Sequence, residues 1–421
     1  MTPRLRIAHL VSTDSGGASK AAYRLHLSLI AAGVDSQFFA CERTNGWPTV
    51  QYLTQRRSFF RLAFVFLKRL AKLLLTLGGK NRREIDIQIV PQGYLAQIDR
   101  MNFDLIHFHW VDGSVASLSE LSKVRAPILW TLHDMRAFTG GYYYLGSHLE
   151  KWMESEETLP AHDMNDHPFV RWAFRSKMAM YKKKKVAAIA PSAWMEKCVR
   201  NADIFPSQWI RRIPYEIPQD PWQNVSSNEA RKKLGLPATA RIILFGADTL
   251  AYSRKGGDLL VAALKKLDAS LASNLGELIV VSFGGGEIAE LEHMPYRYKS
   301  MGRISDEKHL AELYAAANVF VAPSREDNLP NVVLESLAAG TPVVAFHIGG
   351  MPDMIEDGVN GRLVTPFSTD RLLASILEVL QWDDRDAVAK RCRDFVSQKF
   401  HPDQQCKNVI RFYQDFLSDS K

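Results

Sequence analysis

The chain has 421 residues, of which 46% are hydrophobic and 10% aromatic. This composition can fill roughly two or three domain cores, so it excludes a chain that is disordered throughout. The formal net charge of +7 is uneven, with +12 over residues 1–213 and −5 over the remainder. Such asymmetry indicates that the first half faces something anionic, and nucleic acid and a membrane surface are the two candidates.

The cysteines and the first residues favour a cytoplasmic protein. The chain has four scattered cysteines: Cys41, Cys198, Cys392 and Cys406. They show neither metal-ligand spacing nor a disulfide framework, which fits a reducing compartment. The chain leads directly into an apolar run, so no signal peptide is predicted. No apolar run reaches the roughly 20 residues that span a bilayer.

A strand, a glycine-rich turn and a helix open the chain. Residues 7–11 predict a buried strand, and residues 21–32 predict an amphipathic helix. Between them, Gly16 and Gly17 let a ligand or a neighbouring backbone approach the turn closely. The turn does not match G-x-G-x-x-G, so it disfavours a dinucleotide site.

Residues 56–80 predict an amphipathic helix with many large apolar side chains. Four basic residues share one face, at spacings of four, seven and four: Arg57, Arg61, Lys68 and Lys72. This pattern is typical of an element that lies on a membrane surface. A helix packed on its own domain with a solvated basic stripe is the alternative. With the basic pair that follows, the segment 56–83 is our candidate for contact with an anionic membrane.

Two further buried strands are predicted over residues 104–110 and 127–134. His133 ends the second of these, where ligands bind in a parallel sheet. We interpret His107 and His109 as core residues, or as residues that support a ligand-binding side chain, rather than as ligands themselves. An aromatic loop with two glycines then predicts a flexible platform for an acceptor, at residues 138–144. The polar stretch that follows has three histidines without metal-ligand spacing: His148, His162 and His167.

A proline-rich linker is predicted over residues 214–221, which hold three prolines. Strands and helices alternate again after the linker. Two such sets predict an α/β protein with two doubly wound domains that face each other across a cleft, at residues 1–213 and 214–402.

The stretch from residue 319 to residue 346 predicts a strand, a polar loop, a helix and a second strand. The start of the helix would lie at the carboxyl end of the first strand, a position that suits a phosphate. Asp327 in the loop and Glu335 in the helix can accept hydrogen bonds from hydroxyl groups. We interpret this unit as a nucleotide-sugar site, with an ordinary βαβ unit and solvated acids as the alternative.

The chain resembles the retaining GT-B glycosyltransferases, the group that includes sucrose synthase and many bacterial polysaccharide and lipopolysaccharide transferases. The motifs that carry the resemblance are Lys255-Gly256, Gly302, PSREDNLPNVVLESLAAGTPVVAF and GGMPD at residues 349–353. HFHWVDG and WTLHDMRAFTGG in the first half are similar to a subgroup that makes bacterial exopolysaccharide or capsule. The resemblance implies two Rossmann-like domains, the first for the acceptor and the second for the nucleotide sugar. It also implies that a helix at 403–421 crosses back to the first.

The resemblance assigns roles to individual residues. Glu335 matches the second acid of a Glu-x7-Glu motif, which contacts the nucleotide ribose. Asp327 holds the first position, with Glu326 as a substitute. Lys255 matches the lysine of the diphosphate site; the usual arginine is absent, and Arg254 is the candidate replacement. His133 falls near the reacting sugar. The other implied donor contacts are Gly16, Gly17, Gly302, Ile304, Asn328, Leu329, Pro330 and Asn331.

The implied reaction moves a sugar from a UDP- or GDP-sugar to a glycan or lipid-linked acceptor and retains the anomeric configuration. No metal or other cofactor is implied, because the cysteine cluster of the subgroup is missing here. Three alternatives stay open. The first is a basic nucleic-acid-binding protein, although the sequence has no motif of that class. The others are a degenerate scaffolding transferase and an epimerase or phosphorylase-like enzyme of the same architecture. Cytoplasmic protein at the inner face of the membrane is the expected location.

Overall fold

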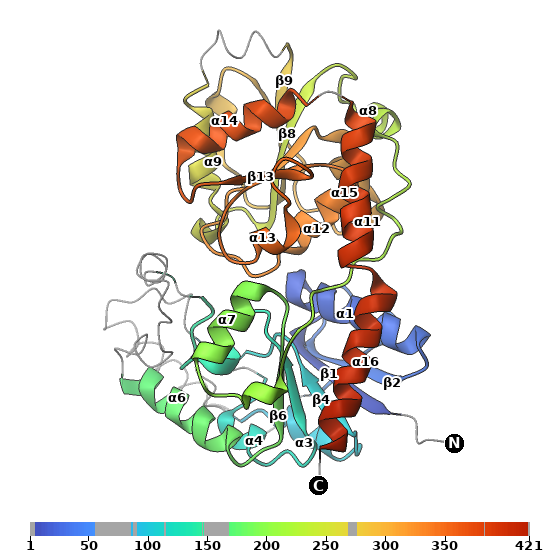
Figure 1. Cartoon of the computed structure of the whole chain (residues 1–421), viewed down its shortest axis with the longest axis vertical. Coiled ribbons are helices and arrows are strands. Elements are labelled where there is room, and N and C mark those ends of the chain that lie inside the picture. The colour runs from blue at the N-terminus through green and yellow to red at the C-terminus, as the bar shows by residue number, and fades with distance from the viewer. Residues whose placement is uncertain are drawn as a thin grey trace. The chain divides into compact units, whose positions relative to one another are not determined.

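The computed structural model describes residues 5–54, 86, 91–112, 115–144, 146, 168–267, 276–382 and 384–419. The chain forms two compact units, which we call domain 1 and domain 2 (Figure 1). Domain 1 comprises Met1–Tyr215 and Asp403–Lys421, and domain 2 comprises Glu216–Pro402. The sequence analysis placed the boundary two residues earlier, within the same proline-rich linker.

Domain 1 is built on a seven-stranded sheet with the order β3-β2-β1-β4-β5-β6-β7. All of its strand pairs are parallel. Strands such as β6, with the sequence VAAIA, are buried along their whole length, as expected where helices cover both faces. The strands are β1 Arg6–Thr13, β2 Asp35–Glu42, β3 Val50–Tyr52, β4 Leu105–Phe108, β5 Ile128–Thr131, β6 Val186–Ala190 and β7 Ile210–Arg212.

The helices of domain 1 include one from the far end of the chain. α16 packs beside α1 (Figure 1), and Phe412, Tyr413 and Phe416 fill a core with Leu29 and Leu105. The α-helices are α1 Gly16–Ala31, α3 Tyr94–Asp99, α4 Leu118–Leu121, α6 Pro168–Tyr181, α7 Ala193–Asn201 and α16 Pro402–Ser418. The 3₁₀ turns are η1 Arg136–Phe138 and η3 Ser207–Trp209.

Domain 2 repeats the same strand order in a six-stranded parallel sheet, β10-β9-β8-β11-β12-β13. Its strands are β8 Arg241–Thr249, β9 Leu278–Gly285, β10 Arg297–Ser300, β11 Val319–Ala322, β12 Val343–Phe346 and β13 Gly361–Val364. Its helices are α8 Ser227–Leu234, α9 Gly257–Leu264, α11 Glu307–Ala316, α12 Asn331–Ala338, α13 Met351–Met354, α14 Thr369–Leu380 and α15 Arg385–Lys399, with η4 Ser253–Lys255 and η5 Ala289–His293.

The winding of each sheet reverses at one point. This switch point lies between β1 and β4 in domain 1 and between β8 and β11 in domain 2. In doubly wound sheets, ligands bind beyond the carboxyl ends of the strands at the switch point. The fold class predicted from the sequence, two parallel doubly wound domains, is therefore confirmed.

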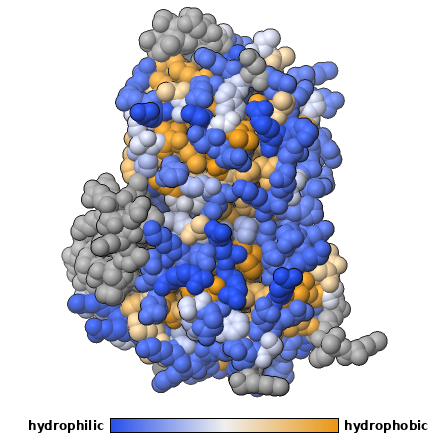
Figure 2. Space-filling view, in the orientation of Figure 1, coloured by the Kyte–Doolittle hydropathy of each residue, from blue (hydrophilic) through white to orange (hydrophobic). Residues whose placement is uncertain are grey.

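Two predictions fall on parts of the chain that the structure does not describe. The basic helix of residues 56–80, with its extension to residue 83, and the histidines at positions 148, 162 and 167 lie outside the described residues. Among the described helices, none combines the length and the apolar character that a membrane span requires. On the face shown in Figure 2, hydrophilic residues predominate and hydrophobic ones form small groups.

Candidate functional site

The ligand edge of domain 2 is formed by the loops that follow β8 and β11. The first loop ends in the 3₁₀ turn Ser253–Lys255, which carries Arg254 and Lys255. The backbone N–H of Arg325 in the second loop donates to the carbonyl of Arg254 at 2.8 Å. The guanidinium of Arg254 donates in turn to the carbonyl of Glu326 at 2.8 Å. The two loops therefore lie against each other at the switch point.

Asp327 pairs with both cations of the first loop. Its carboxylate lies 2.6 Å from Nζ of Lys255 and 3.3 Å from Nη1 of Arg254. Burial on its own raises the pKa of Asp327, but the charges of Lys255 and Arg254 outweigh burial and hold that pKa below its usual range. Burial lowers the pKa of Lys255, an effect that Asp327 partly offsets. One carboxylate facing two cations leaves a net positive charge, which suits an anionic ligand.

Two glycines allow these loops to approach so closely. Gly256 has a φ of +70°, and a Cβ there would lie 1.8 Å from the carbonyl oxygen of Pro323. A Cβ at Gly349 would lie 1.9 Å from the carbonyl oxygen of Asp327. The backbone N–H of Gly350 donates to that same oxygen at 3.2 Å. The Lys-Gly and Gly-Gly motifs of the sequence thus shape the loop that presents Asp327.

Helix α12 starts where the second loop ends. Pro330 occupies the N-cap position and provides no side-chain cap, so the first turn keeps its positive dipole end. Glu335 on this helix and Glu326 in the loop are buried, although glutamates rarely are. Asn328, Leu329 and Asn331 are buried as well. The structure therefore brings together one group of candidate residues in domain 2: Arg254, Lys255, Glu326, Asp327, Asn328, Leu329, Pro330, Asn331 and Glu335.

Gly302 and Ile304 lie apart from this group in the sheet. They follow β10, which stands three strands from β11. The carbonyl of Gly302 accepts a hydrogen bond from the backbone N–H of Gly284 at 2.8 Å, and Gly302 has a left-handed φ of +61°. Gly302 therefore shapes the turn at the carboxyl ends of β9 and β10.

In domain 1, Gly16 and Gly17 belong to a helix rather than to the turn before it. The predicted start at residue 21 was wrong, because α1 begins at Gly16. Asp14, which directly follows β1, anchors this corner. Its carboxylate accepts from the backbone N–H of Gly46 at 2.5 Å and from the hydroxyl of Tyr52 at 2.7 Å. The sequence analysis missed Asp14, whose one signal is an acid at a strand end.

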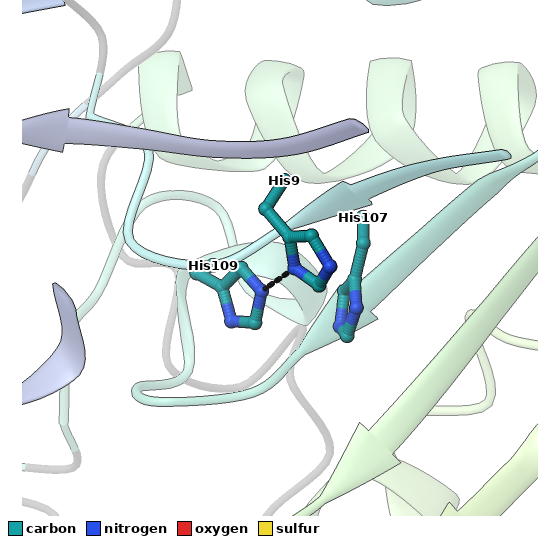
Figure 3. Close-up of side chains that lie close together, drawn as sticks. All are labelled: His9, His107 and His109. Carbon is teal, nitrogen blue, oxygen red and sulfur yellow. Dashed lines mark hydrogen bonds between the residues drawn. The ribbon is translucent and has the colours of Figure 1, made fainter. Parts of the chain in front are cut away.

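His133 follows β5 at the ligand edge of domain 1, and both of its ring nitrogens are engaged. Nε2 lies 3.1 Å from Nδ1 of His109, and Nδ1 lies 2.6 Å from the hydroxyl of Tyr215. Nε2 of His109 lies in turn 2.9 Å from Nδ1 of His9, on β1 (Figure 3). The ring of His133 therefore reaches a ligand through a nitrogen only if one of these bonds is given up.

These imidazoles are neutral because they are buried. Burial, and secondarily the charge of Arg136, lowers the pKa of His133 to about 3. The pKa values of His9, His107 and His109 are lowered well below 6.5, chiefly by burial. The ring nitrogens of His9, His107 and His109 lie within 4.8 Å of one another. His107 contacts the hydroxyls of Tyr413 and Thr131, each at 2.7 Å.

The aromatic loop after β5 packs partly into the core, which speaks against a flexible loop, whereas its Tyr143 and Tyr144 are half-buried. Phe138 is 2% exposed and Tyr142 5%. The buried ammonium of Lys177 donates to backbone carbonyls of this loop, those of Arg136 and Thr139, and holds it in place. No local sequence pattern predicts this role of Lys177, because it lies 38 to 41 residues after the carbonyls that it contacts.

The guanidinium of Arg136 lies against two rings, 4.7 Å from the centre of Trp110 and 4.5 Å from that of Tyr143. It also pairs with Asp134 at 3.1 Å and with Asp86 at 3.3 Å. This buried arginine was missed by the sequence analysis. A signal was present, because Arg136 follows a strand end with an acid two residues before it.

Comparison with known proteins finds a family whose model matches part of domain 2. Residues 240–382 match the family described as glycosyl transferases group 1. A D-inositol 3-phosphate glycosyltransferase of Streptosporangium roseum is 27% identical over 303 residues, 68% of this chain and 64% of the relative. An uncharacterized glycosyltransferase of Methanocaldococcus jannaschii is 27% identical over 330 residues, 74% of this chain and 75% of the relative. The chain thus spans slightly less than two thirds of the first relative.

Solved structures share the fold of the entire chain. HepE of Anabaena, in complex with UDP and glucose, has a TM-score of 0.66 at 16% identity, covering 98% of this chain and 100% of that one. Sucrose-phosphate synthase of Thermosynechococcus elongatus has a TM-score of 0.66 at 20% identity, covering 99% of this chain and 100% of that one. WaaG, a glycosyltransferase involved in lipopolysaccharide biosynthesis, has a TM-score of 0.63 at 16% identity, covering 96% and 99%.

Proposed function

We propose that the chain is a member of the glycosyl transferases group 1 family, whose model matches residues 240–382, and that it transfers a sugar from a UDP- or GDP-sugar to an acceptor hydroxyl. The observation that carries the proposal is the cluster of Arg254, Lys255 and Asp327 at the switch point of domain 2. Its net positive charge lies next to the start of α12. A helix start and two cations are suited to bind a diphosphate. The complexes of HepE with UDP and with UDP-glucose support this choice of ligand.

In this proposal each residue of the cluster has a distinct task. Lys255 and Arg254 contact the diphosphate, while Asp327 keeps both of them in place and contacts the sugar, with Glu326 beside it. Glu335 accepts hydrogen bonds from the ribose. The other proposed donor contacts are Gly16, Gly17, Gly302, Ile304, Asn328, Leu329, Pro330 and Asn331. His133 orients the sugar, either directly or through its neighbours.

The proposed chemistry is a substitution at the anomeric carbon with retention. The bond from that carbon to the phosphate oxygen breaks, and a bond to the acceptor oxygen forms on the same face. The acceptor's proton passes to the leaving phosphate. Negative charge grows on the diphosphate, and the fixed charges of Arg254 and Lys255 stabilise it without reorganising. The proposed mechanism therefore invokes no metal and no other cofactor.

We further propose a glycan or a lipid-linked oligosaccharide as the acceptor, in the synthesis of a bacterial surface polysaccharide or exopolysaccharide. The motifs HFHWVDG and WTLHDMRAFTGG support this assignment, and so does the likeness to WaaG in fold. Such acceptors are presented at the inner face of the cytoplasmic membrane, and the basic segment 56–83 would give peripheral contact there. Flotation with anionic vesicles checks that contact: it should weaken with salt. Equal flotation of the triple variant Arg61→Glu, Lys68→Glu, Lys72→Glu would contradict it.

The transfer itself is tested in two steps with the purified chain. Thermal shift with UDP-, GDP- and ADP-sugars identifies the donor, and a radiolabelled sugar then reports transfer. Lys255→Ala and Glu335→Ala should each lower the rate by at least about 10²-fold with an unchanged fold. Lys266→Ala is the matched control, because Lys266 pairs with Asp370 in an exposed ion pair of the same domain. Full activity of either variant would refute the assignment of Lys255 and Glu335 to the donor site.

A further inference from the structure

Helix α6 lies on the outside of domain 1 (Figure 1) and has two unlike faces. The inward face consists of buried side chains, among them those of Val170 and Phe174. From the same face, the ammonium of Lys177 and the hydroxyl of Tyr181 donate to backbone carbonyls of the loop after β5. These contacts fix the rotation of the helix, so its outward face stays turned away from the core of domain 1.

The outward face combines aromatic rings with cations. The side chain of Trp172 is 48% exposed and that of Phe169 is 39% exposed. Arg171, Arg175 and Lys182 are exposed as well. Their spacings of four and seven residues place them in one row along the helix, which we call the α6 stripe. The backbone N–H of Lys182 still donates to the carbonyl four residues before it, at 3.1 Å, so the helical course extends to the end of the stripe.

The α6 stripe has no acid to pair with in the described parts of domain 1. Residues 168–185 contain seven basic residues and no acidic one, and none of the ion pairs among the described residues includes a member of the stripe. Lys184 and Lys185 differ from the stripe, because they donate to backbone carbonyls of domain 1. A row of unpaired exposed cations attracts an anion from outside the molecule.

An anionic membrane surface fits both the cations and the aromatic rings of this face. Cations near such a surface are attracted to its headgroups, and tryptophan is favoured at the boundary between headgroups and acyl chains. Nucleic acid is the other polyanion to consider. It is disfavoured because the sequence has no motif of that class. Proteins that stack unpaired bases on aromatic rings also do so in a positively charged groove, whereas Trp172 and Phe169 stand on an outward helix face.

We propose that the outward face of α6 is a membrane-contact surface, which binds anionic lipid headgroups through the α6 stripe and places Trp172 and Phe169 among them. This surface is distinct from the segment 56–83, and the contact does not depend on the transferase function. Because α6 also holds the loop after β5, that loop would lie about 10 Å, one helix diameter, from the lipid. An acceptor carried by a lipid would be within reach there, a consequence that does rest on the function proposed above.

Flotation of the purified full chain with vesicles tests the contact. The wild type should float with vesicles of phosphatidylcholine and phosphatidylglycerol, but not with vesicles of phosphatidylcholine alone. The double variant Arg171→Glu, Arg175→Glu should bind the anionic vesicles at least about 25-fold more weakly, because each basic residue near such a surface contributes roughly fivefold. Trp172→Ala should weaken binding by about tenfold, since it removes apolar surface that the lipid would cover.

Matched controls are available on other helices of domain 1. The double variant Lys407→Glu, Arg411→Glu reverses two exposed cations, also four residues apart, on α16 at the opposite side of the domain (Figure 1). Leu27→Ala removes an apolar side chain that is 43% exposed on α1. Both controls should bind the anionic vesicles within about twofold of the wild type, because salt screens charges that lie far from the contact.

The outcomes separate this contact from the other proposals. A wild type that does not float, or an α6 double variant that floats equally, would overturn the contact. Equal losses in the α6 and α16 double variants would overturn it too, because net charge would then explain both. If the α6 double variant lost binding of a labelled RNA but kept its vesicle binding, the stripe would belong to nucleic acid instead. A wild type that floats through α6 but transfers no sugar would leave the contact standing and remove only the transferase.

Discussion

The two domains share one strand order but hold different chemistry at its switch point. In domain 1 neutral imidazoles joined by hydrogen bonds lie on β1 and just after β4 and β5. In domain 2 the loops beyond β8 and β11 hold a charged cluster of Lys255, Arg254 and Asp327. Neutral networks orient groups without attracting ions, whereas a cluster with surplus positive charge attracts an anion. The scaffold thus fixes where a site lies, and the side chains at the switch point fix what it does.

The largest difference between the domains should appear in acid. The pKa values of His9, His107 and His109 lie well below 6.5, and burial lowers those of His133 and His26 to about 3 and about 4. Between pH 6.5 and these values the unfolded chain binds protons that the folded domain does not. The contribution of these histidines to the free energy of unfolding is therefore complete above pH 6.5. As the pH decreases below 6.5, each histidine lowers that free energy by up to about 1.4 kcal/mol per pH unit.

Domain 1 should therefore open before domain 2 as the pH falls from 7 to 5. Hydrogen exchange with mass spectrometry, read by domain, checks this order. In domain 2 the pKa of Asp327 is lowered, so the stability that this carboxylate contributes is present above its unfolded pKa, near 4, and is lost only in stronger acid. Simultaneous opening, or loss of domain 2 first, would contradict the comparison.

A smaller, local loss of stability is expected from Gly256→Ala. The added Cβ would meet the carbonyl oxygen of Pro323 at 1.8 Å and force the two loops of domain 2 apart, at a cost of about 3 kcal/mol. Gly235→Ala is the control, because Gly235 has a similar φ of +64° with nothing within 4 Å. It should cost about 1 kcal/mol from backbone strain alone. Urea unfolding of both variants checks the difference; equal costs would mean that the loops can separate freely.

The sequence predicted the repeated fold well, and the contacts within each site poorly. Apolar runs and glycines mark strands and turns locally, so both sheets and the loop that holds Asp327 were foreseen. The pairing of Asp327 with Lys255 joins positions 72 residues apart. The imidazole chain joins residues separated by 100, 24 and 82 positions. Such contacts depend on strand register and loop packing, which no local pattern encodes.

His107 and His109 illustrate this limit of local reasoning. The sequence analysis interpreted both as core residues, and both are buried. His109 bonds to the rings of His9 and His133, whereas His107 bonds to two hydroxyl groups. This difference depends on the neighbours that β1, β5 and α16 supply. Those neighbours include Tyr413, which lies 306 positions from His107. Burial could be predicted from an apolar strand, but the partner could not.

The charged cluster of domain 2 can be probed by removing one charge. Asp327→Asn keeps the shape but leaves Lys255 without its carboxylate, so we expect a loss of about 2 kcal/mol in stability. The double variant Asp327→Asn, Lys255→Met should lose less than the sum of its single variants, because no unpaired charge remains. Urea unfolding of the wild type, the two single variants and the double variant gives the coupling free energy between Asp327 and Lys255. Strict additivity would mean that the ion pair at 2.6 Å contributes nothing to the fold.

The smallest predicted effect concerns the hydrogen bond between His107 and Tyr413 in domain 1. Tyr413→Phe removes the hydroxyl that lies 2.7 Å from Nδ1 of His107, and one buried hydrogen bond contributes about 1 kcal/mol. Because α16 packs into the core of domain 1, amide exchange should quicken in domain 1 and stay unchanged in domain 2. Tyr252→Phe is the matched control, since Tyr252 is 45% exposed on domain 2 and should change stability by less than about 0.5 kcal/mol. Faster exchange in domain 2 after Tyr413→Phe would show that the two switch points are coupled rather than independent.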